Sequence, residues 1–590
     1  MRWIATFVIG ALIGVFAWTA RAADGDGSPR TLHARLRIAE QTFDPATANA
    51  AESLWISTFI MEMPLRYDAL ARPYQLRTRT AVDMPEVSPD RLQVTVRIRP
   101  GIYFADDPAF GRRRELTAED YVYTLKRHID PIVRSTQEHY ARQTFAGFEE
   151  AFQKAMKSGH FDYDGPLEGA SAPDRYTLRL KLTHPVDMLP RLAFCPLICP
   201  IARDVTALYG EHLAEHPVGT GPYRLAQWRR GSLIVLERNP NYREVRYEEH
   251  AGPGDEAAAR AAAHLHSRLL PLATRVELLV ITEAEPAWLA FRNSELDFLA
   301  LPTNLSENAV ANGRLRPELA QQGITMEASV DALCNFYTEF NMDDPVVGGY
   351  TPEKVALRRA IGLAQNVSDD IRVFFSGAAQ PPDSLAPPGD IGRNSEAHAL
   401  QRQYDPAQAR ALLDTYGYRQ PAGQAWRRQP DGSALTIELL SFAGDQRYRT
   451  LEELWLRDLK AVGLRLEVKR AEPQALFRQL RAGTFMVDNS GFCGGRVALD
   501  HYRYLTSGEL GGFNASRFRL SRYDELFSRA EALPPGPEQA ALLGDMDKLI
   551  AAYAPYLMAP NPIIYALAHK GVLGVRADSP YPDLSRIGFE

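Results

Sequence analysis

Short stretches of alternating apolar and polar residues recur along the chain, and helical patterns follow them. Every second residue of Leu92–Ile98 is apolar, which predicts a half-buried strand, and Pro100-Gly101 predicts the turn that ends it. Thr117 stands before a stretch with apolar residues at helical spacing, so it is expected to cap a helix that Pro131 closes. This alternation of strand, turn and helix predicts an α/β fold.

Two distant passages share one pattern, which predicts two similar lobes. Residues 285–301 (EPAWLAFRNSELDFLAL) and 473–491 (PQALFRQLRAGTFMVDNSG) each begin with a proline-led amphipathic helix and continue into an apolar strand. Clefts between such lobes are common ligand sites.

The N-terminus has the features of a secretory signal peptide. Arg2 precedes an apolar run from Ile4 to Trp18, and Ala20-Arg21-Ala22 predicts cleavage after Ala22. A membrane anchor is the alternative, but the run is shorter than the roughly 20 residues that span a bilayer. No cysteine stands at the cleavage point, so no lipid anchor is expected. The mature protein is expected outside the cytoplasm.

Composition excludes one class of partner. The formal net charge is −6, whereas nucleic-acid binding requires a basic face. The length of 590 residues exceeds what one hydrophobic core usually supports, so two or three domains are expected.

Four cysteines are too few for a disulfide-dense scaffold. Cys195 and Cys199 are expected to form one local disulfide or to remain small buried residues. A metal site would need further soft ligands nearby, and none is visible in the sequence.

Catalytic motifs are absent or incomplete. His212–His216 fits the zinc pattern H-x-x-E-H, but Pro217 would break the helix and no third ligand follows. No G-x-S-x-G elbow occurs, and Cys493 has no histidine nearer in sequence than His501. We therefore expect no catalysis, no cofactor and no bound metal.

A series of segments resembles the family 5 extracellular solute-binding proteins, the periplasmic receptors of ABC importers for peptides and nickel. The most extended is HPVGTGPYRLAQWRRGSLIVLERNPNY, at residues 216–242, and FDPATA, IRPGIYFADD, LTAEDYVYTLKR, LRRAIGLAQN, YDPAQARALLDTYGY and LRAGTFMVDNSGF follow the family's order. The resemblance covers nearly all of the mature chain.

The resemblance implies a two-lobed periplasmic-binding-protein-like fold with three domains. After the signal peptide (1–22), the expected divisions are a discontinuous first lobe (23–67, 190–325 and 560–590), an inserted domain (68–189) and a second lobe (326–559). The lobes are expected to be joined by crossover strands near 324–328 and 558–561.

The resemblance also implies a ligand site at the end of the strand that contains Cys493. Family members carry an aromatic residue, a second wall residue and, two positions later, an aspartate for the α-ammonium of the peptide. Phe492 and Cys493 take the first two positions, and Gly495 stands where the aspartate would be. Cys493 is therefore interpreted as a wall residue. The remaining expected contacts are Asn49, Ala51, Tyr140, Asp488, Gly494, Arg496 and Asp500.

The missing carboxylate leaves two alternatives open. Asp488 or Asp500 supplies the charge from a neighbouring position, or the ligand lacks a free amine, because a buried ammonium without a partner is costly. Our hypothesis at this level is a ligand class shifted away from ordinary short peptides.

The implied function is periplasmic capture of a peptide or peptide-like solute for an ABC permease and its ATPase subunits. We expect a monomer. The alternatives are a secreted peptide hydrolase, which would need a nucleophile, a base and oxyanion donors, and a ligand-sensing receptor of the same fold.

Overall fold

The computed structural model describes residues 30–590 except 49, 73, 332–333, 395–397, 401, 444–446, 494–496, 511 and 578–580. The predicted signal peptide lies outside the described residues. Among those that are described, no helix combines the length and apolar character needed to cross a bilayer.

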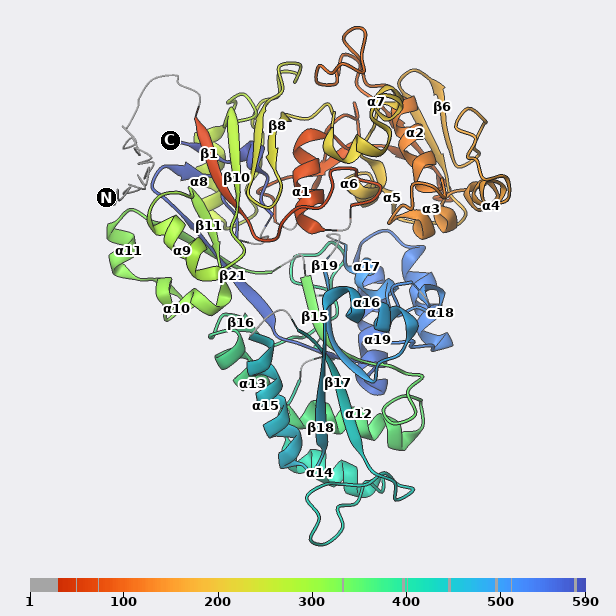
Figure 1. Cartoon of the computed structure of the whole chain (residues 1–590), viewed down its shortest axis with the longest axis vertical. Helices are drawn as coiled ribbons and strands as arrows, with labels where there is room; N and C mark the ends of the chain where they lie inside the picture. The colour runs from red at the N-terminus through yellow and green to blue at the C-terminus, as the bar shows by residue number, and fades with distance from the viewer. Residues whose placement is uncertain are drawn as a thin grey trace, which may run out of the picture.

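The upper lobe (residues 30–324 and 569–590) contains a four-stranded sheet. Its order is β1 (Thr31–Leu36), β10 (Arg275–Val280), β9 (Leu233–Arg238) and β8 (Tyr223–Arg229). Strand β1 pairs with β10 in parallel, and its alternate residues Leu32, Ala34 and Leu36 are fully buried. The period of two in the sequence thus places one face of the strand in the core. Helix α1 (Ala51–Ile60) lies beside this sheet (Figure 1).

A second sheet of the upper lobe confirms the predicted strand and helix. It is antiparallel, in the order β4 (Glu86–Val87), β5 (Gln93–Arg97), β7 (Thr177–Lys181) and β6 (Ala170–Asp174), and helices α2 (Ala118–His128), α3 (Glu138–Thr144) and α4 (Phe148–Ser158) pack near it. Helix α2 begins after Thr117, whose backbone N–H donates to the Asp120 carboxylate at 2.7 Å. This bond satisfies a free donor at the helix start.

The lower lobe (residues 331–560) contains a five-stranded mixed sheet. Its order is β18 (Arg465–Ala471), β17 (Thr436–Phe442), β19 (Val487–Cys493), β15 (Cys334–Phe340) and β20 (Tyr556–Met558). One face packs on α12 (Pro352–Ala364), α14 (Pro406–Thr415) and α15 (Arg447–Ala461), and the other on α17 (Ala498–Arg503), α18 (Ser521–Glu531) and α19 (Pro537–Tyr553). The central strands of the sheet are therefore covered on both faces, whereas the edge strand β18 has exposed residues.

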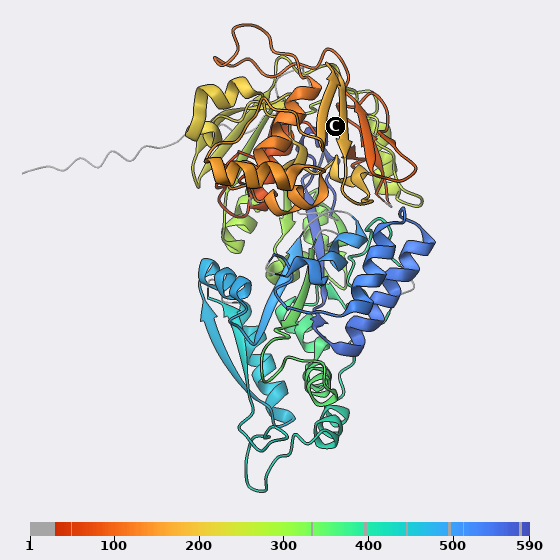
Figure 2. The same ribbon diagram turned by 90° about the vertical axis from the view of Figure 1, so that its right-hand side faces the viewer.

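One long strand connects the two lobes. Strand β21 (Asn561–Ala568) pairs at its start with β16 (Ala379–Gln380) of the lower lobe and at its end with β11 (Phe298–Leu301) of the upper lobe. Along most of its length it also pairs with β14 (Thr325–Val330), which runs the other way. Figure 1 shows β21 crossing between the lobes, and the perpendicular view in Figure 2 shows the same division. The domain boundaries proposed from the sequence stay a prediction.

The two similar passages form the predicted helix and strand. Helix α9 (Ala284–Arg292) leads into β11, and α16 (Pro473–Ala482) leads into β19. An alanine-rich stretch forms helix α8 (Glu256–Leu265).

The local disulfide expected as one alternative is present. Cys195 and Cys199, at the two ends of the short helix α6 (Cys195–Ile198), are bonded to each other. Both residues are buried, at 3% and 0% exposure. The proline-flanked turn brings the two α-carbons to 4.8 Å, within the range that a disulfide requires.

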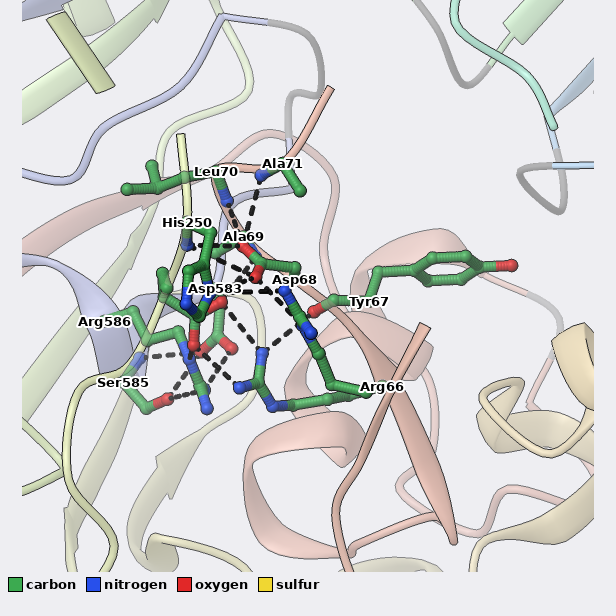
Figure 3. Close-up of polar contacts among 12 residues, drawn as sticks. Arg66, Tyr67, Asp68, Ala69, Leu70, Ala71, His250, Asp583, Ser585 and Arg586 are labelled. Carbon is green, nitrogen blue, oxygen red and sulfur yellow. Dashed lines mark hydrogen bonds and ion pairs between the residues drawn. The ribbon is translucent and has the colours of Figure 1, made fainter. Parts of the chain in front are cut away.

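A buried ion network joins three distant segments of the upper lobe (Figure 3). The Glu249 carboxylate lies 2.8 Å from Arg66 and 2.7 Å from Arg586, and accepts a hydrogen bond from the Ala69 backbone N–H at 2.7 Å. Burial by itself would raise the pKa of Glu249, but Arg586 and Arg66 outweigh it and hold this pKa well below its usual range. Glu249 therefore stays ionised and ties β2 (Leu65–Tyr67) to the C-terminal segment.

Replacing Glu249 by glutamine is expected to destabilise the upper lobe by about 3 kcal/mol at pH 7, because two buried guanidinium groups lose their anion. The difference in stability should shrink below about pH 4. There the Glu249 carboxylate of the unfolded wild-type chain takes up a proton while that of the folded protein stays ionised, so wild type also loses stability. Thermal unfolding of both proteins at the two pH values measures this. The matched control is Glu256→Gln, whose side chain is 90% exposed. Equal melting of Glu249→Gln and wild type at pH 7 would contradict the assigned role.

Candidate functional site

The predicted ligand strand ends where the two lobes meet. Strand β19 leads towards α17, and both lie below α3 and the short helix α5 (Met188–Arg191) of the upper lobe (Figure 1). The structure brings three predicted site residues to this interface: Tyr140 on α3, Phe492 on β19 and Asp500 on α17.

Three aromatic rings form a row along the lower lobe at this interface. The centroids of Phe492 and Tyr504 lie 4.1 Å apart, and those of Tyr504 and Phe513 lie 4.9 Å apart. Phe513 is 55% exposed, so this aromatic row extends from the partly buried Phe492 to the surface. Such rings offer flat apolar area to a ligand.

Phe492 rests against a buried polar pair. Its ring meets the His501 ring edge-on at 5.5 Å, and Nε2 of His501 lies 2.9 Å from the Asp390 carboxylate. The side chains of His501 and Asp390 are 2% and 0% exposed. This packing holds one wall of the site against the lobe core.

An ion pair crosses the interface. Arg191 of α5 donates to the Asp500 carboxylate, and the guanidinium lies 5.2 Å from the centre of the Tyr140 ring. Burial by itself would lower the pKa of Arg191, but Asp500 outweighs it and raises this pKa. The pair brings opposite charges from the two lobes together and so stabilises their contact.

Two weaker contacts join the lobes beside this pair. Arg503 of α17 forms an ion pair with Glu531 of α18, whose backbone carbonyl accepts a hydrogen bond from Arg91 of the upper lobe at 3.2 Å. His184 of the upper lobe lies 3.9 Å from the Glu531 carboxylate. The interface is therefore strongly polar on the side of α17.

Glu509 is a site candidate that sequence reasoning missed. It ends a short 3₁₀ turn (Ser507–Glu509) between α17 and α18 and is 6% exposed. Burial raises its pKa, and the nearby charges of Arg503 and His139 act in the opposite direction. In the sequence, Glu509 is only an acidic residue with glycines nearby, and this pattern matches no known motif.

Asp488 lies in a different environment. It is fully buried in the middle of the lower-lobe sheet, directly opposite Glu339 of β15, which is 2% exposed. Burial raises the pKa of Asp488 to about 7 and raises that of Glu339, which the Asp488 charge raises further. Contact of Asp488 with a ligand stays a prediction. The complete burial of its side chain does not favour such a contact.

The other predicted contacts are only partly described. Ala51 begins α1, and the preceding loop is fastened to the upper-lobe helices by an ion pair of Asp44 with Arg127 at 2.7 Å. The Thr136 backbone N–H donates to the Ala46 carbonyl at 2.9 Å in the same loop. Asn49, Gly494, Gly495 and Arg496 lie outside the described residues.

Cys493 ends β19, and its backbone partner across the sheet is Cys334 of β15. Cys334 is disulfide-bonded. The role of Cys493 as a wall residue stays a prediction.

The described part of the chain holds no group of three or more His, Cys, Asp or Glu side chains arranged to bind a metal ion. In the H-x-x-E-H segment, His216 stacks on Tyr209 at 4.0 Å between ring centres. This ring contact accounts for one of the two histidines of the segment.

Removing the negative charge of the Arg191–Asp500 pair is expected to favour an open arrangement of the two lobes. Asp500→Asn leaves Arg191 without its anion in the closed arrangement, at a cost of about 2–5 kcal/mol. Small-angle scattering should then show a larger radius of gyration than for wild type. Asp164→Asn, which breaks an exposed pair with Arg203 inside the upper lobe, is the control and should leave the radius unchanged. An unchanged radius for Asp500→Asn would rule out a role of the pair in closure.

Replacing Asp488 by asparagine is expected to stabilise the lower lobe at alkaline pH. The folded protein holds the Asp488 proton more tightly than the unfolded chain, so wild type loses stability as pH rises from about 4 to 7. The variant avoids this loss, with a gain on the order of 4 kcal/mol at pH 8 and little at pH 4. Denaturant unfolding at both pH values measures it, with Asp545→Asn, half-exposed on α19, as control. A variant less stable than wild type at pH 8 would contradict the assignment.

The chain is similar over most of its length to curated bacterial proteins. The di/tripeptide-binding protein 2 of Pseudomonas aeruginosa is 24% identical over 599 aligned positions, covering 98% of each chain. The heme-binding protein A of Haemophilus influenzae is 21% identical, covering 84% of this chain and 81% of that protein.

Solved structures share the fold. The periplasmic binding protein DppA of Helicobacter pylori, in complex with the peptide STSA, superposes with a TM-score of 0.70 at 20% identity, covering 95% of this chain and 98% of that one. The oligopeptide-binding protein AppA of Bacillus subtilis, with a nonapeptide, gives a TM-score of 0.71 at 14% identity, covering 95% and 100%. Residues 47–512 match the family described as bacterial extracellular solute-binding proteins, family 5 Middle. The chain belongs to the family 5 bacterial extracellular solute-binding proteins.

Proposed function

We propose that this protein captures a peptide or peptide-like solute between its two lobes in the periplasm and delivers it to the permease of an ABC importer. The observation that carries the proposal is the meeting of aromatic and charged side chains from both lobes beside Arg191 and Asp500. Family membership and the di/tripeptide-binding relative support a peptide ligand.

Closure of the lobes is the step that makes delivery selective. A ligand shifts the molecule towards the closed state only by the amount that it binds this state more tightly than the open one. Strand β21 keeps the lobes in register at one side, and the contacts of Arg191 form on the side of α17. The permease can then distinguish the closed, loaded receptor from the open one.

The site expected from the sequence comprises Asn49, Ala51, Tyr140, Asp488, Phe492, Cys493, Gly494, Gly495, Arg496 and Asp500. Of these, Tyr140, Phe492 and Asp500 lie at this interface, and we propose that Tyr504 and Phe513 extend the site. Exclusion of water from the closed interface strengthens hydrogen bonds to a peptide backbone. We further propose that a signal peptide cleaved after Ala22 directs the protein to the periplasm, that it acts as a monomer without catalysis, and that its permease works with ATPase subunits.

Identification of the bound solute tests the function. Protein purified from its native periplasm is denatured, and the released small molecules are analysed by mass spectrometry. We expect peptides or peptide-like solutes at up to one per protein, and the same compounds should rebind unchanged to the emptied protein in calorimetry. Conversion of the solute during incubation would favour the hydrolase alternative. Release of no peptide-like solute, together with no binding from a peptide library, would overturn the proposal.

A further inference from the structure

A cavity in the upper lobe lies beside α4, at the end of the lobe that is distant from β21 (Figure 1). Its volume is about 250 Å³, which is room for roughly eight molecules of the size of water. Helix α4 and the loop of residues 159–168 that follows it form most of the walls, and α2 contributes one residue. None of the interlobe contacts described above involves a residue that lines this cavity.

One of the lining residues is a buried lysine. Lys126 of α2 is 5% exposed, and its Nζ donates to the backbone carbonyls of Tyr163 and Gly165, both at 2.9 Å. Gly165 also lines the cavity, so the ammonium lies at its edge. An ammonium has three donors, and these two bonds leave one of them for a further partner.

The charge of Lys126 has no close counter-charge within the described part of the chain. Glu119 and Asp164 interact with it electrostatically, but neither forms an ion pair with it. A buried cation without an ion-pair partner is costly, and an anion in the adjacent cavity would remove much of this cost. Lys154 and His160 line the same cavity and add to its positive side.

Two acidic residues limit the charge that the cavity can accept. Asp162 and Glu168 line it, although both have other partners: Asp162 accepts a hydrogen bond from the Gly165 backbone N–H at 2.9 Å, and Glu168 forms an ion pair with Lys181. Their charges repel an anion, and they repel a dianion such as phosphate twice as strongly. A single negative charge is therefore the better match.

The remaining walls are apolar. Phe161 and Ala155 are 4% and 3% exposed, and Ala151 and Leu167 lie beside them in the lining. Pockets for small molecules combine such apolar walls with a few polar groups that fix the orientation of the ligand. The lining thus suits a ligand with one anionic group and a small hydrocarbon part.

We propose that this cavity is a second binding site, which takes a small organic monocarboxylate with its carboxylate towards Lys126 and its hydrocarbon part against Phe161 and Leu167. The site is separate from the interface between the lobes, and the inference does not depend on the proposed function.

Binding of benzoate tests the proposal. The purified protein is titrated with benzoate and, separately, with benzamide, which has nearly the same shape without the charge, and ligand-observed NMR measures both affinities. We expect a Kd of about 1 mM or below for benzoate and binding of benzamide about 10 to 100 times weaker, because benzamide lacks the charged hydrogen bond. An excess of a mixed tripeptide library should not displace benzoate.

Three variants locate the site. Lys126→Met removes the charge and should reduce the affinity for benzoate to that for benzamide. Ala151→Leu fills the cavity and keeps Lys126, so it should abolish binding of both compounds, and it serves as the test if Lys126→Met fails to fold. Lys157→Met is the matched control, since Lys157 is exposed on the same helix and does not line the cavity. Melting curves establish that each variant is folded.

The other outcomes overturn the site. These are no binding of benzoate at 10 mM, about ten times the expected Kd, equal affinity of wild type for the two compounds, and unchanged binding of benzoate in Ala151→Leu. Displacement of benzoate by the tripeptides would place it between the lobes and would also overturn the site. None of these results contradicts capture of a solute between the lobes, which the analysis of released solutes tests separately.

Discussion

The pairing of β21 with strands of both lobes is the constraint on which the arrangement depends. Its first residues belong to the lower lobe through β16, and its last to the upper lobe through β11. Sliding one lobe along the other would break these backbone hydrogen bonds together, whereas a small bend between the two pairings keeps them. The lobes are therefore expected to move as a hinge about the crossing strands, so that the contacts near α17 open and close most.

Buried charges inside one lobe and buried charges between the lobes have different effects on closure. Glu249 is enclosed by Arg66 and Arg586 within one lobe, so its charge is compensated whatever the lobes do. Arg191 and Asp500 meet only while the lobes are in contact, so their attraction contributes to closure. Glu509 has a carboxylate oxygen, Oε2, that is buried without a hydrogen-bond partner among the described residues, and burial raises its pKa.

The aromatic row is positioned by polar chemistry beneath it. Phe492 packs on His501, which lies against the buried Asp390 and near Asn335 of the neighbouring strand. These groups come from a loop, a helix and a strand that are far apart in the sequence. Packing against the core thus fixes the position of Phe492, whereas Phe513 at the other end of the aromatic row is exposed.

Local patterns were sufficient for several of the elements, whereas the ligand site stays a prediction. The alternation before Pro100 and the cap at Thr117 depend on neighbouring residues, so β5 and α2 were predicted closely. The resemblance to the family placed Phe492, Tyr140 and Asp500 in the predicted site, and the structure brings them to the interface, where their contact with a ligand stays a prediction. Arg191 was missed because its partner is 309 positions away, and nothing near it in the chain distinguishes it from a surface arginine.

The sequence by itself determined the strands and helices, the two-lobed family and the absence of the aspartate at Gly495. Only the tertiary structure decided the surroundings of each carboxylate. In the sequence Asp488, Asp500 and Glu509 are equivalent acidic residues, but folding buries the first opposite Glu339, pairs the second with Arg191 and leaves the third without a partner among the described residues. The reason is physical: the state of an ionisable group depends on its burial and on charges within a few ångströms, and distant segments supply both.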